Sequence, residues 1–269
     1  MVTYKSRALF YARTSAGKYP LDVYEIGAAF RASEGVPERI RLFRDERLKR
    51  ISQKDTPVLL HQSKWLSLHI LPVANMEMRT SIDLENVYSK SSEFCPIGVS
   101  SHNLRYNMDG VCIYTTRNGA AEEFGYTQVF RSGAIEMLYL RPLAQGSSGG
   151  TWVQTMPIED GLIKCVSRYL AALKQLEVES PLVLMVSLVG FKGASLDVLG
   201  VESQHSCLDL SGYRIDRELI NLPDVWIEDI EADMSLALRP VFDAMWQASG
   251  LPRSRNYEDD GTRKTPRRA

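Results

Sequence analysis

The stretch GYTQVFRSGAIEMLYL, residues 125–140, decides the fold class of this chain. Two runs rich in aromatic and β-branched residues, 126–130 and 134–140, flank the short sequence Arg-Ser-Gly. Such runs on either side of a glycine-containing turn are typical of a β-hairpin, and Gly133 can adopt the positive φ that the turn requires. The stretch therefore predicts an antiparallel pair of strands in the middle of the chain.

Strands and amphipathic helices are predicted on both sides of this hairpin. Apolar and β-branched runs predict strands at residues 64–73, 110–116, 181–190 and 216–230, the last interrupted by Pro223. Apolar residues at helical spacing predict helices at residues 157–178 and 231–248, the second with a kink or a new start at Pro240. Because strands and helices alternate irregularly around a hairpin, the predicted fold is α+β. We expect a mixed or antiparallel sheet with packed amphipathic helices, and not a doubly wound sheet.

The composition is that of an ordinary globular protein. The chain has 269 residues, of which 44% are hydrophobic and 24% charged, enough for one large domain or two ordinary ones. Its formal net charge of −1 produces no global field that would attract nucleic acid or an anionic membrane. Any binding of an anion therefore requires a local patch of cations.

The cysteines and the apolar runs indicate a cytoplasmic protein. Four cysteines stand far apart without a CxxC pair, which argues against a structural zinc site and fits a reducing compartment. No charged segment followed by an apolar core opens the chain, so no signal peptide is predicted. The most apolar run, residues 181–191, is much shorter than the ~20 residues of a membrane helix. We therefore expect no membrane partner. Because the sequence contains no Rossmann, Walker or HExxH motif, we also expect no cofactor.

The N-terminal stretch FYARTSAGKYPLDVYEIGAAF, residues 10–30, contains the first candidate site residues. A strand is predicted over residues 2–12, continuing to Arg13, and is followed by a short polar loop. A helix is then predicted from about Asp22, with Glu25 at the spacing of a capping box.

Four residues of this stretch, Arg13, Ser15, Gly17 and Lys18, lie at the predicted junction between strand and helix. Backbone N–H groups at such a junction, together with added cations, favour the binding of a phosphate group. The alternative is an ordinary tight connection whose charges are exposed to solvent.

A basic helix is predicted over residues 37–54, with Pro37 in its first turn. At 100° per residue its apolar residues share one arc: Val36, Ile40, Phe43, Leu48 and Ile51. Arg44 and Arg47 project into the same arc, where a purely solvated charged face would not place them. We therefore expect both arginines to pair with carboxylates or to reach a ligand.

Three further polar clusters have a functional and a structural interpretation. His102, Arg105 and Asp109 could form an active site or a loop network that caps the next strand. The sequence His-Ser-Cys at 205–207 places a thiol beside an imidazole, but adjacent residues of a strand point to opposite faces. Carboxylates at 228–233 could bind a divalent cation, or could simply occupy a helix N-terminus.

Several of these stretches resemble a known family. YARTSAGKYPLDVYEIGAAF resembles the end of the Schlafen AlbA-type DNA-binding domain, in which a strand FY-x-R-x-S precedes a loop and a helix with E-I/L. The residues at those places are Tyr11, Arg13, Ser15, Asp22, Glu25 and Phe30. The remainder resembles the C-terminal region attached to this domain in bacterial proteins often labelled ATP-binding. Its marks are FRDERLKRI (43–51), RYNMDG (105–110), YTQVFRSGAIE (126–136) and LRPVFDAMWQASGLPRSRNY (238–257).

The resemblance implies a division of the chain and an incomplete first domain. Residues 1–34 would be the end of the Schlafen AlbA-type domain, 35–55 a basic connecting helix, 56–252 an α+β domain and 253–269 a disordered polar tail. In the family a larger upstream portion exists, and in Schlafen-type nucleases it supplies the acidic catalytic residues. Because Met1 falls just before the final strand of that domain, we expect no nuclease centre in this chain alone.

The resemblance and the cations together predict a nucleic-acid-binding protein that contacts DNA or RNA phosphates without sequence specificity and has no catalytic activity of its own. The predicted binding residues are Arg13, Ser15, Gly17, Lys18, Arg44 and Arg47. One alternative is a structural or protein-interaction module without nucleic-acid contact, and homo-oligomerisation stays open. Another is a fragment of a Schlafen-like nuclease or of an ATP-dependent protein.

Overall fold

The computed structural model describes residues 2–4, 7–9, 11–14, 17–20, 35–74, 81–99, 101–115, 125–145, 151–196 and 213–264. The chain forms two compact units, Met1–Lys49 and Arg50–Ala269. The larger unit combines helices with an antiparallel sheet and a small mixed sheet, which confirms the α+β fold class. In the described part of the chain, no helix has the length and apolar character needed to cross a membrane.

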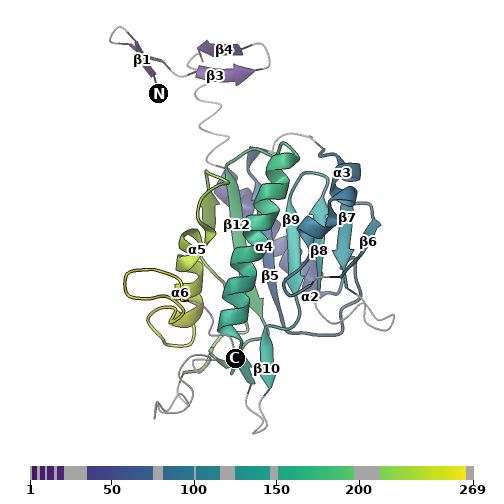
Figure 1. Ribbon diagram of the computed structural model, residues 1–269, viewed down its shortest axis with the longest axis vertical. Helices are drawn as coiled ribbons and strands as arrows, with labels where there is room; N and C mark the ends of the chain where they lie inside the picture. Colours follow the sequence, from purple (N-terminus) through teal and green to yellow (C-terminus); the bar gives the residue numbers. More distant parts are fainter. Residues whose placement is uncertain are drawn as a thin grey trace. The chain divides into compact units, whose positions relative to one another are not determined.

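The smaller unit contains two β-hairpins and most of one helix (Figure 1). Strand β1 (Val2–Tyr4) pairs with β2 (Arg7–Leu9), and β3 (Tyr11–Thr14) pairs with β4 (Gly17–Pro20). Helix α2 (Val36–Ser52) begins in this unit and ends in the larger one, within one or two residues of the prediction.

The single strand predicted over residues 2–12 is therefore wrong. Val2 pairs with Leu9 in an antiparallel register, so this segment forms two short strands. The polar residues Lys5 and Ser6 interrupt the apolar run, and the sequence alternates poorly, which a single continuous strand does not explain. The helix predicted from Asp22 lies outside the described residues.

An eight-stranded antiparallel sheet forms the centre of the larger unit (Figure 1). Its strands, in spatial order, are β14 (Leu219–Asn221), β12 (Leu182–Val189), β5 (Trp65–Pro72), β9 (Ile135–Tyr139), β8 (Gly125–Phe130), β7 (Gly110–Tyr114) and β6 (Asn103–Tyr106), with β15 (Val225–Ile227) also paired to β12. The strands predicted around residues 64–73, 110–116 and 181–190 are confirmed, as is the interruption at Pro223.

The predicted central hairpin is confirmed as β8 and β9. The amide of Phe130 donates to the carbonyl of Ala134 at 2.8 Å, which closes the turn. Gly133 has a φ of 83°, a value that residues with a side chain adopt only at a cost. The glycine of the Arg-Ser-Gly turn is thus required by the backbone conformation.

Helix α4 (Thr155–Gln175) crosses one face of this sheet, in front of β12 and β5 in Figure 1. Leu162, Val166, Tyr169 and Leu173 on its apolar side are buried, and the hydroxyl of Tyr169 lies 3.1 Å from that of Thr127 in β8. The sheet contributes alternate residues to the same core, among them Leu66, Leu68 and Ile70 of β5. The helix is therefore held by apolar burial on the sheet and by a hydrogen bond to it.

The remaining elements surround α4 and the ends of the sheet. Next to α4 lie α5 (Met234–Ala237) and α6 (Arg239–Gln247), and the predicted new start at Pro240 is confirmed. Helix α3 (Leu84–Ser89) contacts β7, and the 3-10 helix η2 (Ser91–Phe94) contacts α4. The small mixed sheet consists of β10 (Leu143–Gln145), β11 (Thr151–Val153) and β13 (Ser195–Leu196).

The polar C-terminal segment is ordered as far as Lys264, so disorder was the wrong expectation for residues 253–264. Tyr257 is buried and forms an isolated β-bridge with Arg263. Ser254 and Asn256 are buried as well. The composition suggested a solvated tail because it could not show that these polar groups have a buried partner.

Candidate functional site

The hairpin of β3 and β4 contains the predicted phosphate-binding residues of the smaller unit. Its register pairs Arg13 with Lys18 and Thr14 with Gly17. Lys18 is therefore a strand residue, where the sequence predicted a loop that leads into a helix. Ser15 lies outside the described residues.

This register brings two cationic residues directly opposite each other. Residues that are directly opposite in an antiparallel pair lie on the same face of the ribbon, with Cβ atoms about 4.5–5.5 Å apart. Arg13 and Lys18 are thus cross-strand partners in this register, and one further pair, Thr14 and Gly17, lies between them and the turn. Strand pairing therefore places these two residues opposite each other, where the sequence suggested a loop that leads into a helix.

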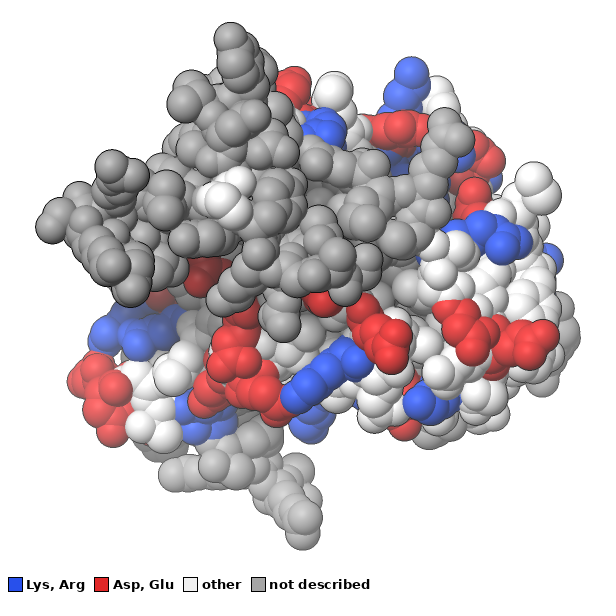
Figure 2. All heavy atoms as spheres, turned by 90° about the horizontal axis from the view of Figure 1, so that it is seen from above, with Lys and Arg blue, Asp and Glu red and all other residues white. Residues whose placement is uncertain are grey.

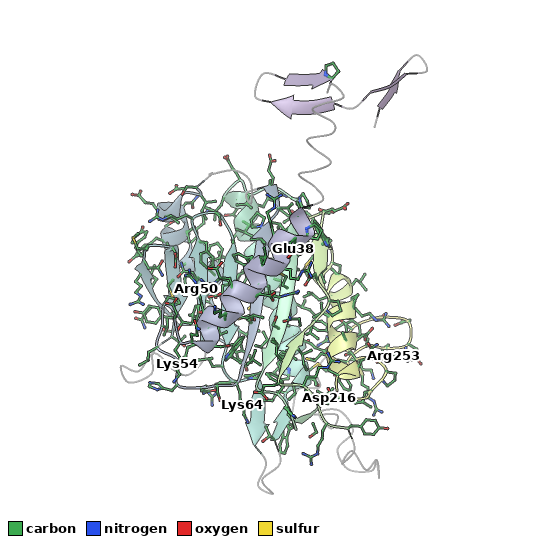
Figure 3. All side chains as sticks on the ribbon, turned by 180° about the vertical axis from the view of Figure 1, so that it is seen from behind. Glu38, Arg50, Lys54, Lys64, Asp216 and Arg253 are labelled. Carbon is green, nitrogen blue, oxygen red and sulfur yellow. The ribbon has the colours of Figure 1, made fainter. Side chains whose placement is uncertain are left out.

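Helix α2 presents a balanced set of charges to solvent. Figure 3 labels Glu38, Arg50 and Lys54 along this helix and just after its end. Between residues 35 and 55 the exposed cations are Arg41, Lys49, Arg50 and Lys54, and the exposed carboxylates are Glu38, Asp45, Glu46 and Asp55. Acidic and basic side chains also intermix among the described residues visible in Figure 2. The exposed surface of α2 is therefore mixed in charge.

The basic surplus of α2 comes from arginines that solvent reaches poorly. Arg47 is only 7% exposed, and Arg44 is half-buried. They lie on the side of the helix that also buries Ile40, Leu48 and Ile51. This burial favours the structural alternative for Arg47, since a buried guanidinium cannot meet a phosphate backbone in this conformation.

His102 belongs to a cluster that the sequence did not indicate. Its Nδ1 lies 3.2 Å from the Sγ of Cys95, and its Nε2 lies 2.9 Å from the Oγ of Ser91. Arg105 instead donates to the carbonyl of Pro57, and Asp109 is exposed in the turn after β6. The three polar residues predicted to act together therefore make separate contacts.

A thiol, an imidazole and a hydroxyl in a row have the arrangement of a nucleophile, a base and an orienting group. Burial raises the pKa of the Cys95 thiol, while Arg168 opposes that shift. The two contacts of His102 fit a thiol that donates to Nδ1 together with an Nε2–H that donates to Ser91. Because Cys95 is only 3% exposed, this cluster serves to fix the loop between η2 and β6.

A second polar cluster lies within the large sheet. The Nε2 of His69 in β5 is 3.0 Å from the Oε2 of Glu136 in β9, and both side chains are fully buried. The hydroxyl of Tyr126 in β8 donates to the other carboxylate oxygen at 2.7 Å. Nothing in the sequence indicated this cluster, because its members are far apart in the chain and meet only through strand order.

Glu159 of α4 is the centre of a third cluster. It is fully buried and accepts hydrogen bonds from the Nε1 of Trp246 at 2.8 Å and from the Oγ of Ser254 at 3.0 Å. It also pairs with Arg263, which bonds Asp160 as well. Burial raises the pKa of Glu159, and the charge of Arg263 opposes that shift. The cluster attaches the C-terminal segment to α4.

Three of the carboxylates at 228–233, those of Asp229, Glu231 and Asp233, have structural partners. The carboxylate of Asp233 accepts from the amide of Ser235 at 2.8 Å at the start of α5. Glu231 pairs with Lys174 at 2.6 Å. In the described ranges, no group of three or more His, Cys, Asp or Glu residues is placed to bind a metal ion. The sequence His-Ser-Cys at 205–207 lies outside those ranges.

One cleft of about 640 Å³ opens beside the N-terminus of α3. Three carboxylates line it, those of Asp83, Glu177 and Glu179. Such a wall repels phosphate, so this cleft does not extend the candidate anion site.

Neither a family model, nor a curated protein, nor a solved structure matches this chain.

Proposed function

We propose that this chain is a nucleic-acid-binding protein that contacts phosphates through the β3–β4 hairpin without sequence specificity, and that it has no catalytic activity of its own. The register that pairs Arg13 with Lys18 is the observation that supports this proposal. Like charges directly opposite each other destabilise an antiparallel pair, and a bound anion removes that repulsion. The hairpin is therefore stabilised by the phosphates that it binds.

The shape of the element also suits nucleic acid. A two-stranded ribbon fits the major groove of a duplex, and cations on one face of it can contact the phosphate backbone. In this proposal the larger unit is a scaffold, and DNA or RNA is the partner. A cytoplasmic location is supported by the three free cysteines of the described residues, Cys95, Cys112 and Cys165.

The proposal is tested by fluorescence anisotropy with labelled duplex and single-stranded oligonucleotides between about 50 mM and 200 mM salt. We expect an affinity that falls linearly with the logarithm of the salt concentration and varies little with sequence. The double variant Arg13→Ala, Lys18→Ala should flatten that slope by about two units, since each phosphate contact contributes about 0.9. The matched control is the double variant Lys192→Ala, Arg253→Ala, which removes two exposed cations of the larger unit.

Absence of binding, or equal slopes for the two double variants, would refute the proposal and favour an interaction module without nucleic-acid contact. Cleavage of the oligonucleotide by the purified chain with a divalent cation would support the nuclease alternative instead.

A further inference from the structure

Strand β6 is the last strand at one side of the eight-stranded sheet, and among the described residues only β7 pairs with it. The amide of Asn107 donates to the carbonyl of Gly110 at 2.9 Å, and the amide of Gly110 donates back at 3.3 Å. In an antiparallel pair, such doubly bonded residues alternate with residues whose N–H and C=O groups point away from the partner strand. The backbone groups of Leu104 and Tyr106 therefore point outward, where a further strand can bind them.

The same strand carries half of an exposed aromatic pair. Tyr106 and Tyr88 of α3 stack with ring centroids 4.7 Å apart and an interplanar angle of 8°. Tyr106 is 50% exposed and Tyr88 is 39% exposed. Tyrosine rings left open to solvent offer apolar area and π faces to a partner, and tyrosine is enriched in protein interfaces.

Carboxylates lie next to this aromatic pair. Asp83 caps α3, and Glu85 lies in its first turn; both are exposed. Tyr88 of the same helix stacks on Tyr106, so both carboxylates belong to the element that contacts this ring. Loss of hydration raises the pKa of the Tyr106 hydroxyl, and the charges of Glu85 and Asp83 raise it further. Asp83 also lines the acidic cleft together with Glu177 and Glu179. This surface therefore favours a cation over a phosphate.

The basic side chains around β6 are bonded to carbonyl and amide oxygens. Lys90 donates to the side chain of Gln175 at 2.8 Å, and the Nε of Arg131 donates to the carbonyl of Met108 at 3.0 Å. Arg105 donates to a carbonyl and lies 5.8 Å from the centre of the Tyr114 ring. Asp83, for its part, accepts hydrogen bonds from two backbone amides of α3, which carry no positive charge.

We propose that β6 and the Tyr88–Tyr106 pair form a docking surface for an extended segment of a partner protein that carries lysine or arginine. The segment adds to the sheet as a strand through the outward backbone groups of Leu104 and Tyr106. Alternate side chains of an added strand fall on the face of the aromatic pair, where a cation gains from the ring faces and from Asp83 and Glu85.

Two other occupants fit this surface less well. Pairing of β6 with β6 of a second copy would bring two sets of Asp83 and Glu85 carboxylates together, which is repulsive. A nucleic acid would meet the same carboxylates with its phosphates. The proposal is independent of the function proposed for the β3–β4 hairpin, which belongs to the other unit.

The test uses the full chain and fluorescein-labelled ten-residue peptides that alternate arginine with threonine. We expect binding of this peptide at low salt, and no binding when glutamate replaces every arginine. N-methylation of alternate backbone amides, which removes the donors of an added strand, should weaken binding by at least about tenfold. Amide resonances of Leu104 and Tyr106 should shift on titration with the arginine peptide.

Protein variants locate the site. The double variant Tyr88→Ala, Tyr106→Ala should weaken binding by about tenfold or more, whereas Trp226→Ala, which removes an exposed aromatic residue from β15, should leave it unchanged. Glu85→Lys is a second variant for the case in which the tyrosine variant does not fold, and it should weaken binding of the arginine peptide. The proposal would be overturned if the glutamate peptide bound as tightly as the arginine peptide, or if N-methylation of the peptide left its affinity unchanged. It would also be overturned if the amide resonances that shift on titration belonged only to strands other than β6.

Discussion

Glu159 is the residue on which the order of the C-terminal segment depends. Three residues from beyond α5 converge on its carboxylate, namely Trp246, Ser254 and Arg263. The guanidinium of Arg263 also lies 4.9 Å from the centre of the Tyr257 ring. A fully buried carboxylate is stable only when cations and donors surround it, so this residue fixes the path of the chain that supplies them.

We predict that Arg263→Ala lowers the free energy of unfolding by about 3–5 kcal/mol, because it leaves Glu159 buried without its cation. Arg253→Ala is the matched control. Arg253, which Figure 3 labels in the same segment, pairs with Asp259, but both side chains are exposed. The control should change stability by less than about 0.5 kcal/mol. Urea denaturation of both variants measures the difference, and equal losses would contradict the role given to Glu159.

The same variant should have a distinctive pH dependence. Without Arg263, the effect of burial on Glu159 is less opposed, so its folded-state pKa rises further above the value of the unfolded chain. The folded state then binds a proton that the unfolded state has released, and stability falls as pH rises through the folded pKa. The loss in free energy of unfolding that Arg263→Ala causes relative to the parent protein should therefore be smaller at pH 5 than at pH 7.5. An equal loss of unfolding free energy at the two pH values would show that lost packing, and not the buried charge, causes the destabilisation.

Arg47 provides a second test at the scale of one residue. Because Arg47 is only 7% exposed, Arg47→Ala should lower stability by about 3 kcal/mol or more as the interactions of a buried guanidinium are lost. Lys49→Ala, on the exposed side of α2, should change stability by less than about 0.5 kcal/mol. Unfolding curves of the two variants decide the point. Equal stability of both, with loss of oligonucleotide affinity only in Arg47→Ala, would instead give Arg47 a binding role.

At the scale of elements, the sequence predicts those whose signal is local. The β8–β9 hairpin, α4 and the break at Pro240 follow from turn chemistry, helical spacing and the geometry of proline. Strand β6 was missed because it has only four residues, Asn-Leu-Arg-Tyr, and this alternation of polar and apolar residues is too short to predict a strand. It is a strand because β7 supplies hydrogen-bonding partners, which is information that its own residues do not carry.

The candidate sites were predictable to a smaller extent than the fold. Arg13 and Lys18 stood out as cations near a turn, but only the register shows that they are opposite each other. The Cys95–His102, His69–Glu136 and Glu159–Arg263 contacts join residues that are 7, 67 and 104 positions apart. Contacts across such separations are set by strand order and helix packing, so no local pattern could have indicated them.

The three free cysteines within the described ranges lie on different parts of the fold and allow a prediction about their protection from alkylation. Cys112 is in β7, Cys165 is in α4, and Cys95 follows η2; all three are buried. Burial raises the pKa of Cys112 to about 12 and also raises the pKa values of Cys95 and Cys165. Since the thiolate is the reactive form, iodoacetamide at pH 8 should label these residues only after unfolding. Mass spectrometry of tryptic peptides measures this, and rapid native labelling of Cys95 alone would show that His102 activates it.

At the scale of the whole molecule, the main hydrophobic core lies within the larger unit. Its members run from Leu66 to Tyr257, and they connect the large sheet to α4, α5 and α6. The hairpins of the smaller unit have strands of only three or four residues. Two-stranded hairpins of this size are at best marginally stable in water by themselves. Stability and the proposed nucleic-acid contact are therefore expected to reside in different parts of the chain.

This separation is tested by deleting residues 1–34 while keeping all of α2. The shortened protein should melt within about 2 °C of the full chain, because a loss of 1 kcal/mol in a protein of this size corresponds to about 2–4 °C. It should also lose the salt-dependent affinity for oligonucleotides while it still binds the arginine peptide at β6. Calorimetry and the two binding assays measure these three properties on one sample. Retained oligonucleotide binding would place the phosphate contacts in residues 35–269, and a large drop in melting temperature would show that the first 34 residues contribute to the stability of the core.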